Sequence, residues 1–133
     1  MQNPRPADPI ERVREAAQVF PGLDALMLYG SRARDDATPN SDWDLGYLAS
    51  GELDAGELHG RIVEVLGDDR VDLVDLARAS GQLRYRAAGD GRTIFERTPG
   101  SVERFRLRAI AYWLDMAPVV RAEYEARLQQ LSG

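Results

Sequence analysis

Apolar residues follow two different spacings along the chain, and their alternation predicts an α/β (α+β) domain. Spacings of three and four predict helices over residues 10–20 and 54–66, with a further short helix after residue 77. Compact apolar runs bounded by turn-forming residues predict strands at 26–29, 42–48, 71–76 and 92–97. We expect the last of these strands to lie at a sheet edge.

Two apolar stripes run through the end of the chain and predict helical structure on either side of Pro118, which would kink or restart the helix. The first stripe consists of Val102, Phe105, Ala109, Tyr112, Trp113 and Met116, and the second of Val120, Tyr124, Leu128 and Leu131. We expect Ser101 to cap the first helix and the first stripe to pack on the domain. The second stripe either packs there too or forms a docking surface for a partner.

The composition is typical of a single globular domain, since 44% of the 133 residues are hydrophobic and 29% are charged. The absence of cysteine excludes disulfides and thiolate metal sites. No apolar run reaches the roughly 18–20 residues of a membrane span. Residues 1–6 lack the apolar core of a signal peptide, so we expect a cytoplasmic protein without a membrane partner.

The charge is unevenly distributed. The net charge is −5, made up of −9 in residues 1–77 and +4 in residues 78–133, and every basic residue is an arginine. The acidic balance argues against direct binding of nucleic acid. The basic second half is suited to facing a triphosphate or an acidic partner.

One short segment carries the candidate chemistry: Gly30-Ser31, then ten residues, then Asp42-Trp43-Asp44. Gly30 permits a sharp turn and a close approach of backbone to ligand. Ser31 is a good N-cap, and residues 32–36 are expected to form one helical turn behind it, whose free N–H groups would attract phosphate. The segment therefore predicts a phosphate-binding turn between two strands.

Asp42 and Asp44 are two residues apart in a predicted strand, so both side chains point to the same face. Two adjacent carboxylates repel each other unless a cation lies between them. Mg²⁺ takes oxygen ligands and shares them with phosphates, and two such ions clamp a displacement at phosphorus. We predict that Asp42 and Asp44 hold two Mg²⁺ ions.

A third acid interrupts the apolar strand 71–76. Asp72 is the candidate third metal ligand, because an acid inside an apolar strand costs free energy unless it is paired or binds a cation. Asp75 is the alternative, with capping of the next turn as its other role. His59 is expected to be an ordinary helix-surface histidine. Arg84 and Arg86 either contact phosphate or a partner or are simply solvated.

The spacing Gly30-Ser31, ten residues, Asp42-x-Asp44 resembles the signature of nucleotidyltransferases with the DNA polymerase β-type fold. The size and residues 71–97 resemble the minimal nucleotidyltransferase (MNT) antitoxins of HEPN–MNT toxin–antitoxin systems. The resemblance implies a small mixed sheet of about four strands with helices on one side. It also implies a nucleotidyltransferase core at residues 1–98, with residues 99–133 as a C-terminal helical extension of the same domain.

The resemblance further implies transfer of AMP from ATP to a tyrosine of a HEPN-domain ribonuclease toxin, which silences the toxin. Arg32 and Arg34 would then neutralise charge on the leaving group. Asp35 departs from the family pattern, which often has glycine there, and would add negative charge near the phosphates unless it points away. The alternatives are an antitoxin that acts by binding alone, a transferase for a small molecule such as an aminoglycoside, and a nucleic-acid-tailing enzyme.

Overall fold

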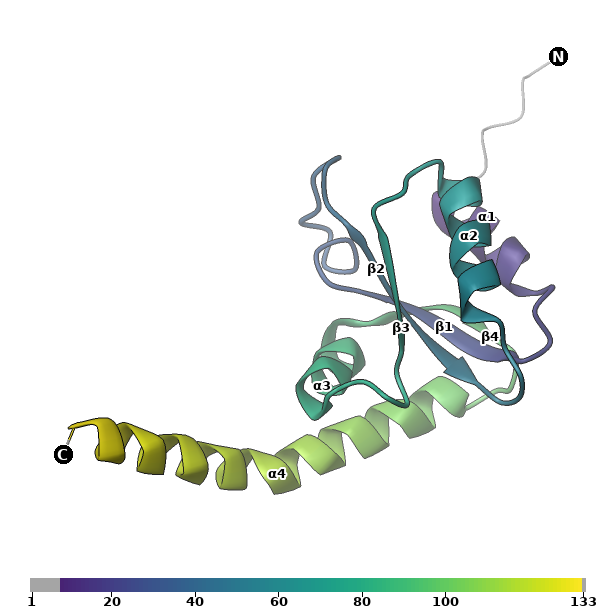
Figure 1. Cartoon of the computed structure of the whole chain (residues 1–133). Coiled ribbons are helices and arrows are strands. Elements are labelled where there is room, and N and C mark those ends of the chain that lie inside the picture. Colours follow the sequence, from purple (N-terminus) through teal and green to yellow (C-terminus); the bar gives the residue numbers. More distant parts are fainter. Residues whose placement is uncertain (1–7, 133) are drawn as a thin grey trace, which may run out of the picture.

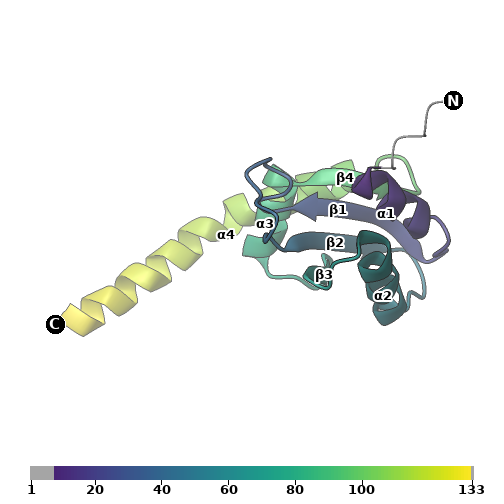
Figure 2. The same ribbon diagram turned by 90° about the horizontal axis from the view of Figure 1, so that it is seen from above.

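The computed structural model describes residues 8–132, which form one four-stranded sheet and four helices (Figures 1 and 2). The elements in chain order are α1 (Pro9–Ala17), β1 (Leu23–Tyr29), β2 (Trp43–Ala49), α2 (Ala55–Leu66), β3 (Val71–Asp75), α3 (Gly81–Asp90), β4 (Arg92–Glu96) and α4 (Ser101–Ser132). The predicted mixture of helices and strands is confirmed.

The sheet has the order β3-β2-β1-β4 and is mixed. β1 runs antiparallel to β2 and to β4, whereas β2 and β3 run parallel. The edge position predicted for the last strand is confirmed. The register pairs Tyr29 with Asp44 across β1 and β2, and Asp44 with Asp72 across β2 and β3.

Helices cover both faces of the sheet, which corrects the expectation that they all lie on one side (Figure 1). The reason lies in β1, which is apolar at successive positions. Leu26 and Leu28 pack with α1 and α2 on one face, whereas Ala25 and Met27 pack with α3 and α4 on the other. A strand that is apolar on both faces needs cover on both.

Side chains outside the helices satisfy the free N–H groups at several helix starts. Asp54 accepts from the backbone N–H of Glu57 at the start of α2, and Ser80 accepts from that of Leu83 at the start of α3. The start of α4 differs from the prediction that Ser101 is its cap. The carboxylate of Glu96, at the end of β4, accepts instead from the backbone N–H of Val102 at 2.9 Å.

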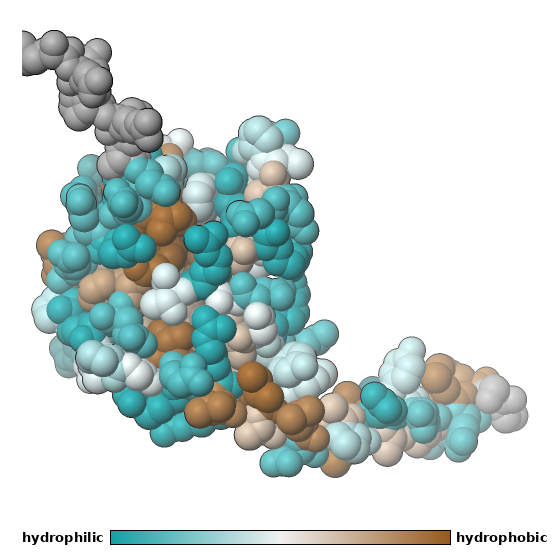
Figure 3. Space-filling model, turned by 180° about the vertical axis from the view of Figure 1, so that it is seen from behind, coloured by the Kyte–Doolittle hydropathy of each residue, from teal (hydrophilic) through white to brown (hydrophobic). Residues whose placement is uncertain are grey.

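α4 is a single helix that continues through Pro118 and then leaves the domain (Figure 1). Its first turns carry the buried residues Val102, Phe105 and Ala109, so packing of the first stripe is confirmed in this part. Beyond the proline the second stripe projects, and Tyr124 is 63% exposed. We call this projecting part of α4, residues 119–132, the arm. Apolar groups lie along the arm in the space-filling view (Figure 3). Among the described helices, none combines the length and apolar character needed to cross a membrane.

Candidate functional site

The turn after β1 brings backbone against a carboxylate. Gly30 has φ +75°, and a Cβ at this position would lie only 2.4 Å from Oδ2 of Asp44. Both the left-handed conformation and the close contact require glycine. The expected sharp turn at Gly30 is therefore present, with Asp44 as the group that approaches it.

Residues 31–35 form hydrogen-bonded turns and no regular helix. The carbonyl oxygen of Gly30 accepts from the N–H groups of Ala33 and Arg34, which is a local helix-like arrangement. Asp35, with φ 60°, ends it after one turn, since an L-residue does not continue a right-handed helix from that conformation. Within residues 8–132, neither the Ser31 hydroxyl nor its backbone N–H donates a hydrogen bond, so both are available to a ligand.

Asp44 and Asp72 lie on the face of the sheet covered by α3 and α4, and Asp42 directly precedes β2, close enough for its charge to act on Asp44. On β2, Trp43 and Leu45 pack against the α1–α2 side, so the alternating position Asp44 points the other way. On β3, Val74 packs on the α3–α4 side, and Asp72 shares its face. The register then sets Asp72 directly beside Asp44.

Asp75 points to the opposite face of the sheet. Its Oδ1 accepts from the backbone N–H of Ala77 at 3.0 Å, which is the turn-capping role considered for it in the sequence. Its charge also acts on Tyr47, which packs on the α1–α2 side. The structure thus brings Asp72, and not Asp75, together with Asp44.

The three acids create a strongly negative site. Burial raises the pKa of Asp44, and the nearby charges of Asp72 and Asp42 raise it further. Arg86 and Arg34 partly oppose this rise. Burial and the charges of Asp44 and Asp72 also raise the pKa of Tyr29 to about 12, so its hydroxyl is a neutral donor at physiological pH.

These carboxylates fit a hard divalent cation by their chemistry. They supply oxygen ligands, which Mg²⁺ prefers, and their mutual repulsion would be relieved by a cation. As they stand, no three acidic or histidine side chains within residues 8–132 are close enough together to hold one ion. Asp42, Asp44 and Asp72 are the residues that would hold such an ion.

Arg32 lies away from the acids. Its guanidinium stacks over the ring of Trp43, 4.1 Å from the centroid, and donates to the carbonyl oxygen of Ser41 at 2.8 Å. Because Trp43 packs on the α1–α2 side, this placement gives Arg32 a structural role in the loop and does not support the phosphate contact predicted for it. Asp35 lines the same side of the loop with Arg32 and Trp43, so it points away from Asp44.

Arg34 lies on the side of the acids. It pairs with Asp90 at the end of α3, at 3.0 Å, and with Asp36 at 3.4 Å. Its charge lowers the pKa of Asp44, so it is close enough to influence the site. The pair with Asp90 links the loop after β1 to α3.

Two residues of the site were not predicted from the sequence or were left undecided. The sequence places Tyr29 at the end of a strand but gives it no role in the site. Its antiparallel pairing with Asp44 is the feature that brings it there. Arg86 was considered together with Arg84, and the structure separates them. Arg86 acts on Asp44 and lines a cavity of about 360 Å³ with Tyr85, whereas Arg84 lines a different cavity.

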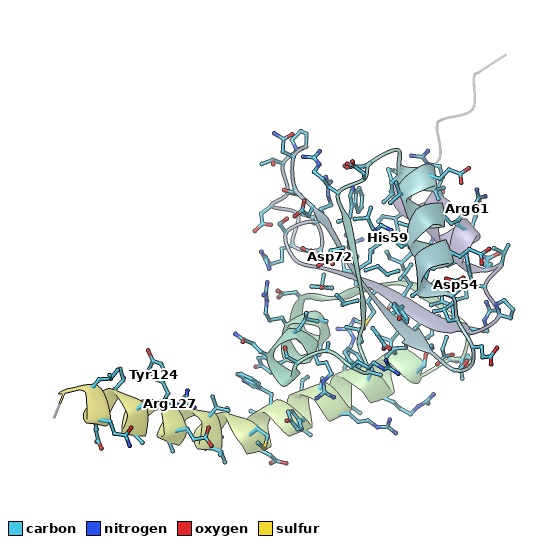
Figure 4. The ribbon with its side chains drawn as sticks, in the orientation of Figure 1. Asp54, His59, Arg61, Asp72, Tyr124 and Arg127 are labelled. Atoms are coloured by element: carbon cyan, nitrogen blue, oxygen red, sulfur yellow. The ribbon has the colours of Figure 1, made fainter. Side chains whose placement is uncertain are left out.

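His59 has a structural contact. Its Nε2 lies 2.9 Å from the carbonyl oxygen of Val71, which ties α2 to β3. It is half-buried on α2, whose position beside β3 can be followed in Figure 4. The predicted position on a helix is confirmed, and the ring has a structural contact there and is not simply a surface group.

Comparison with protein families gives a match over most of the domain. The family model "Polymerase beta, Nucleotidyltransferase" matches residues 11–99, from within α1 to just beyond β4. The matched segment contains the Gly30 turn and the acids Asp42, Asp44 and Asp72.

The proteins of similar sequence or structure include an adenylyltransferase and chains of toxin–antitoxin complexes. Protein adenylyltransferase MntA of Aphanizomenon flos-aquae (strain 2012/KM1/D3) is 26% identical over 118 residues, which are 80% of this chain and 79% of that protein. A chain in the crystal structure of a toxin–antitoxin with AMP-PNP superposes with a TM-score of 0.70 and 27% identity, over 93% of this chain and 98% of that one. A chain of the complex between tri-AMPylated Shewanella oneidensis HEPN toxin and MNT antitoxin gives 0.66 and 26%, over 94% and 97%.

Proposed function

The chain belongs to the polymerase beta nucleotidyltransferase family, and on that premise we propose that it is a protein adenylyltransferase. It transfers AMP from ATP to a tyrosine hydroxyl of a HEPN-domain toxin and thereby neutralises the toxin. The observation that carries the proposal is the pairing of Asp44 with Asp72, beside Asp42 and against the turn at Gly30. Carboxylates next to a turn with free N–H donors support nucleotidyl transfer as the chemistry of this site.

The choice of ATP and of a protein acceptor is supported by the relatives. The similar protein of Aphanizomenon flos-aquae is named a protein adenylyltransferase. One similar structure contains AMP-PNP, and another contains an AMPylated HEPN toxin together with its MNT antitoxin. This chain covers 98% and 97% of the two superposed chains, so the likeness extends over nearly their whole length.

Gly30 and Ser31 would bind the triphosphate. The absence of a side chain at Gly30 lets phosphate oxygens approach the backbone, and the Ser31 hydroxyl and N–H would donate to them. Arg34 and Arg86 flank Asp44 and would place positive charge near the leaving pyrophosphate. Arg32 has no part in this arrangement.

Asp42, Asp44 and Asp72 would hold the Mg²⁺ ions. When bound, Mg²⁺ neutralises phosphate charge and lowers the pKa of an acceptor hydroxyl. Asp72 is exposed and stands at the edge strand β3, so it is accessible to an acceptor entering from solvent. It would accept the proton of the incoming tyrosine hydroxyl.

In the proposed reaction the tyrosine oxygen forms a bond to the α-phosphorus of ATP. The bond between that phosphorus and the oxygen bridging to the β-phosphorus breaks, and pyrophosphate leaves. The proton of the hydroxyl passes to Asp72. No residue is oxidised or reduced, and the products are tyrosyl-AMP on the toxin and free pyrophosphate.

The test is the intact mass of the cognate HEPN toxin after incubation with this protein, ATP and Mg²⁺. The expected result is the addition of one or more AMP groups to a tyrosine, identified by peptide mapping. The gain should vanish in EDTA and with the double variant Asp42→Ala/Asp44→Ala. That variant should still bind the toxin, because the two acids lie at the sheet and not on the exposed part of α4 beyond Pro118.

Two results would overturn the proposal. An unchanged toxin mass, with inhibition that persists in the double variant, would identify an antitoxin that acts by binding alone. Transfer of AMP to an aminoglycoside or another small molecule, with none to the toxin, would identify a small-molecule transferase.

A further inference from the structure

A second cavity, of about 350 Å³, lies on the α3–α4 side of the sheet. Asp24 at the start of β1 and Leu48 near the end of β2 line it, together with residues from the beginnings of α3 and α4. Tyr29 and Asp44 stand at the opposite ends of these two strands. The five residue steps from Asp24 to Tyr29 span roughly 17 Å of extended chain, so this cavity is distinct from the acidic site.

Three arginines line this cavity: Arg84 from α3 and Arg104 and Arg108 from α4. In the part of the chain that the structure describes, none of them forms an ion pair with a carboxylate. Arg106, on another side of the same helix, instead donates to two backbone carbonyl oxygens. Asp24 is the one acid in the lining, so the cavity carries an uncompensated charge of about +2 and favours an anion.

Two polar atoms in the wall of this cavity are buried without a partner among the described residues. They are Oδ1 of Asp24 and Nε of Arg84. The Arg84 guanidinium is held over the ring of Tyr112, 4.9 Å from its centroid, and so stays close to the cavity. A buried donor and a buried acceptor without partners each cost free energy, and a small side-chain rotation toward a ligand would satisfy both.

We infer that this arginine pocket, lined by Asp24, Arg84, Arg104 and Arg108, binds a small phosphate-bearing molecule that also carries hydroxyl groups. The phosphate would accept from the arginines, since guanidinium–phosphate hydrogen bonds are strong and directional. A hydroxyl would donate to the Asp24 carboxylate, as ribose hydroxyls do to acidic residues. The volume lies within the range of small-ligand sites, and a nucleoside monophosphate combines both groups.

The test is a titration of AMP into the ¹⁵N-labelled full chain in EDTA, followed by NMR. The Nε–H resonance of Arg84 reports on the pocket directly. We expect it to shift with saturation, and to shift equally in the Asp44→Asn variant, because the acidic site is separate. The double variant Arg104→Gln/Arg108→Gln should weaken binding at least about tenfold, because it removes two charge-assisted contacts.

Arg121→Gln is the matched control, since it removes an exposed arginine from α4 outside the pocket and should leave the affinity unchanged. Ribose 5-phosphate should bind much as AMP does, and inorganic phosphate at least about tenfold more weakly, because it lacks the sugar hydroxyls. An unshifted Arg84 resonance would overturn the inference. So would equal affinity for adenosine and AMP, or equal losses in the double variant and the Arg121 control, with spectra showing that all variants are folded.

Discussion

Asp44 and Asp72 stand directly beside each other on neighbouring parallel strands, and Asp75, three residues further along, faces the other side of the sheet. This arrangement assigns different roles to two acids of the same strand. One contributes charge to the site that contains Asp44, and the other holds the turn at the end of β3.

The first prediction compares Asp72→Asn with Asp75→Asn. Asp72→Asn should lower AMP transfer to the toxin by about 10²–10⁴-fold, the usual contribution of a general base. Asp75→Asn should keep the transfer rate within about threefold but destabilise the fold by about 0.5–1.5 kcal/mol, because it weakens the bond to the Ala77 N–H. Single-turnover rates and chemical denaturation measure the two effects. Equal losses of activity would show that position relative to Asp44 does not decide function.

The second prediction concerns the stability of the metal-free protein. The folded-state pKa of Asp44 is raised, so its ionised form destabilises the fold fully above that pKa. The effect decreases as the pH falls and disappears below the ordinary pKa of an aspartate in the unfolded chain. Asp44→Asn should therefore raise the Tm at pH 7 in EDTA by about 1–3 °C, a small gain because the side chain is only half-buried. Thermal unfolding at pH 7 and near pH 3 provides the measurement.

The difference in Tm between Asp44→Asn and the native chain should shrink at the lower pH, because the protonated aspartic acid is then as neutral as the asparagine that replaces it. Added Mg²⁺ should raise the Tm of the native chain and have much less effect on Asp44→Asn. A lower Tm for the variant at pH 7 would contradict the inferred repulsion among Asp42, Asp44 and Asp72.

The third prediction uses two glycines. Gly30→Ala should destabilise the fold by about 1–2 kcal/mol, because alanine is strained at a positive φ. Its Cβ would also displace the Asp44 carboxylate, so transfer should be lost. Gly60→Ala in α2 meets no atom within 4 Å and should stabilise the helix by about 0.5–1 kcal/mol with full activity. Denaturation and transfer rates of the two variants would be compared, and an active Gly30→Ala would show that the close contact with Asp44 is dispensable.

The fourth prediction separates the arginines of the loop. Arg32→Gln should lower stability by about 1 kcal/mol, because it loses the stacking on Trp43 and the bond to Ser41, yet leave the KM for ATP within about twofold. Arg34→Gln should raise that KM several-fold, because Arg34 lies near Asp44. Steady-state kinetics with varied ATP distinguish them. A larger increase in KM for Arg32→Gln than for Arg34→Gln would support the phosphate contact predicted for Arg32 from the sequence.

The sequence was sufficient for features that depend on local geometry. Strand alternation placed Asp44 opposite Trp43 and Leu45, and the same rule separated Asp72 from Asp75 within β3. The predicted strand began one residue too early, since β2 starts at Trp43 and Asp42 precedes it. The strands and the family signature also follow from short-range patterns, whereas the helix restart considered at Pro118 is absent because α4 continues through it. The division into a core at 1–98 and an extension at 99–133 stays a prediction, although the buried Phe105 shows that α4 contributes to the core.

Features that depend on contacts between distant residues were not predictable in the same way. The stacking of Arg32 on Trp43 requires the loop to fold back across eleven residues, and a sequence pattern carries no such constraint. Tyr29 joins the site through the antiparallel register of β1 and β2. Glu96 displaced Ser101 as the cap of α4 because its longer side chain reaches the Val102 N–H from the end of β4.

The last prediction concerns the part of α4 beyond Pro118. Val120 and Tyr124 lie one turn apart and are 51% and 63% exposed, and Tyr124 and Arg127 project away from the domain in Figure 4. If this arm docks on the toxin, Val120→Ser/Tyr124→Ser should weaken the complex at least about tenfold, because two apolar side chains would no longer be buried. The same variant should leave the Tm of the isolated protein within about 1 °C, since neither side chain is buried in the core.

Calorimetric titration of the toxin measures the affinity of the docking variant, with Arg121→Gln/Glu125→Gln as a control that removes one charge of each sign from the same arm. AMP transfer by the docking variant should fall at low toxin concentration and recover at high concentration, because only binding is impaired. Unchanged affinity would show that the toxin docks elsewhere. A lower rate at saturating toxin would show instead that the arm positions the acceptor tyrosine near Asp72.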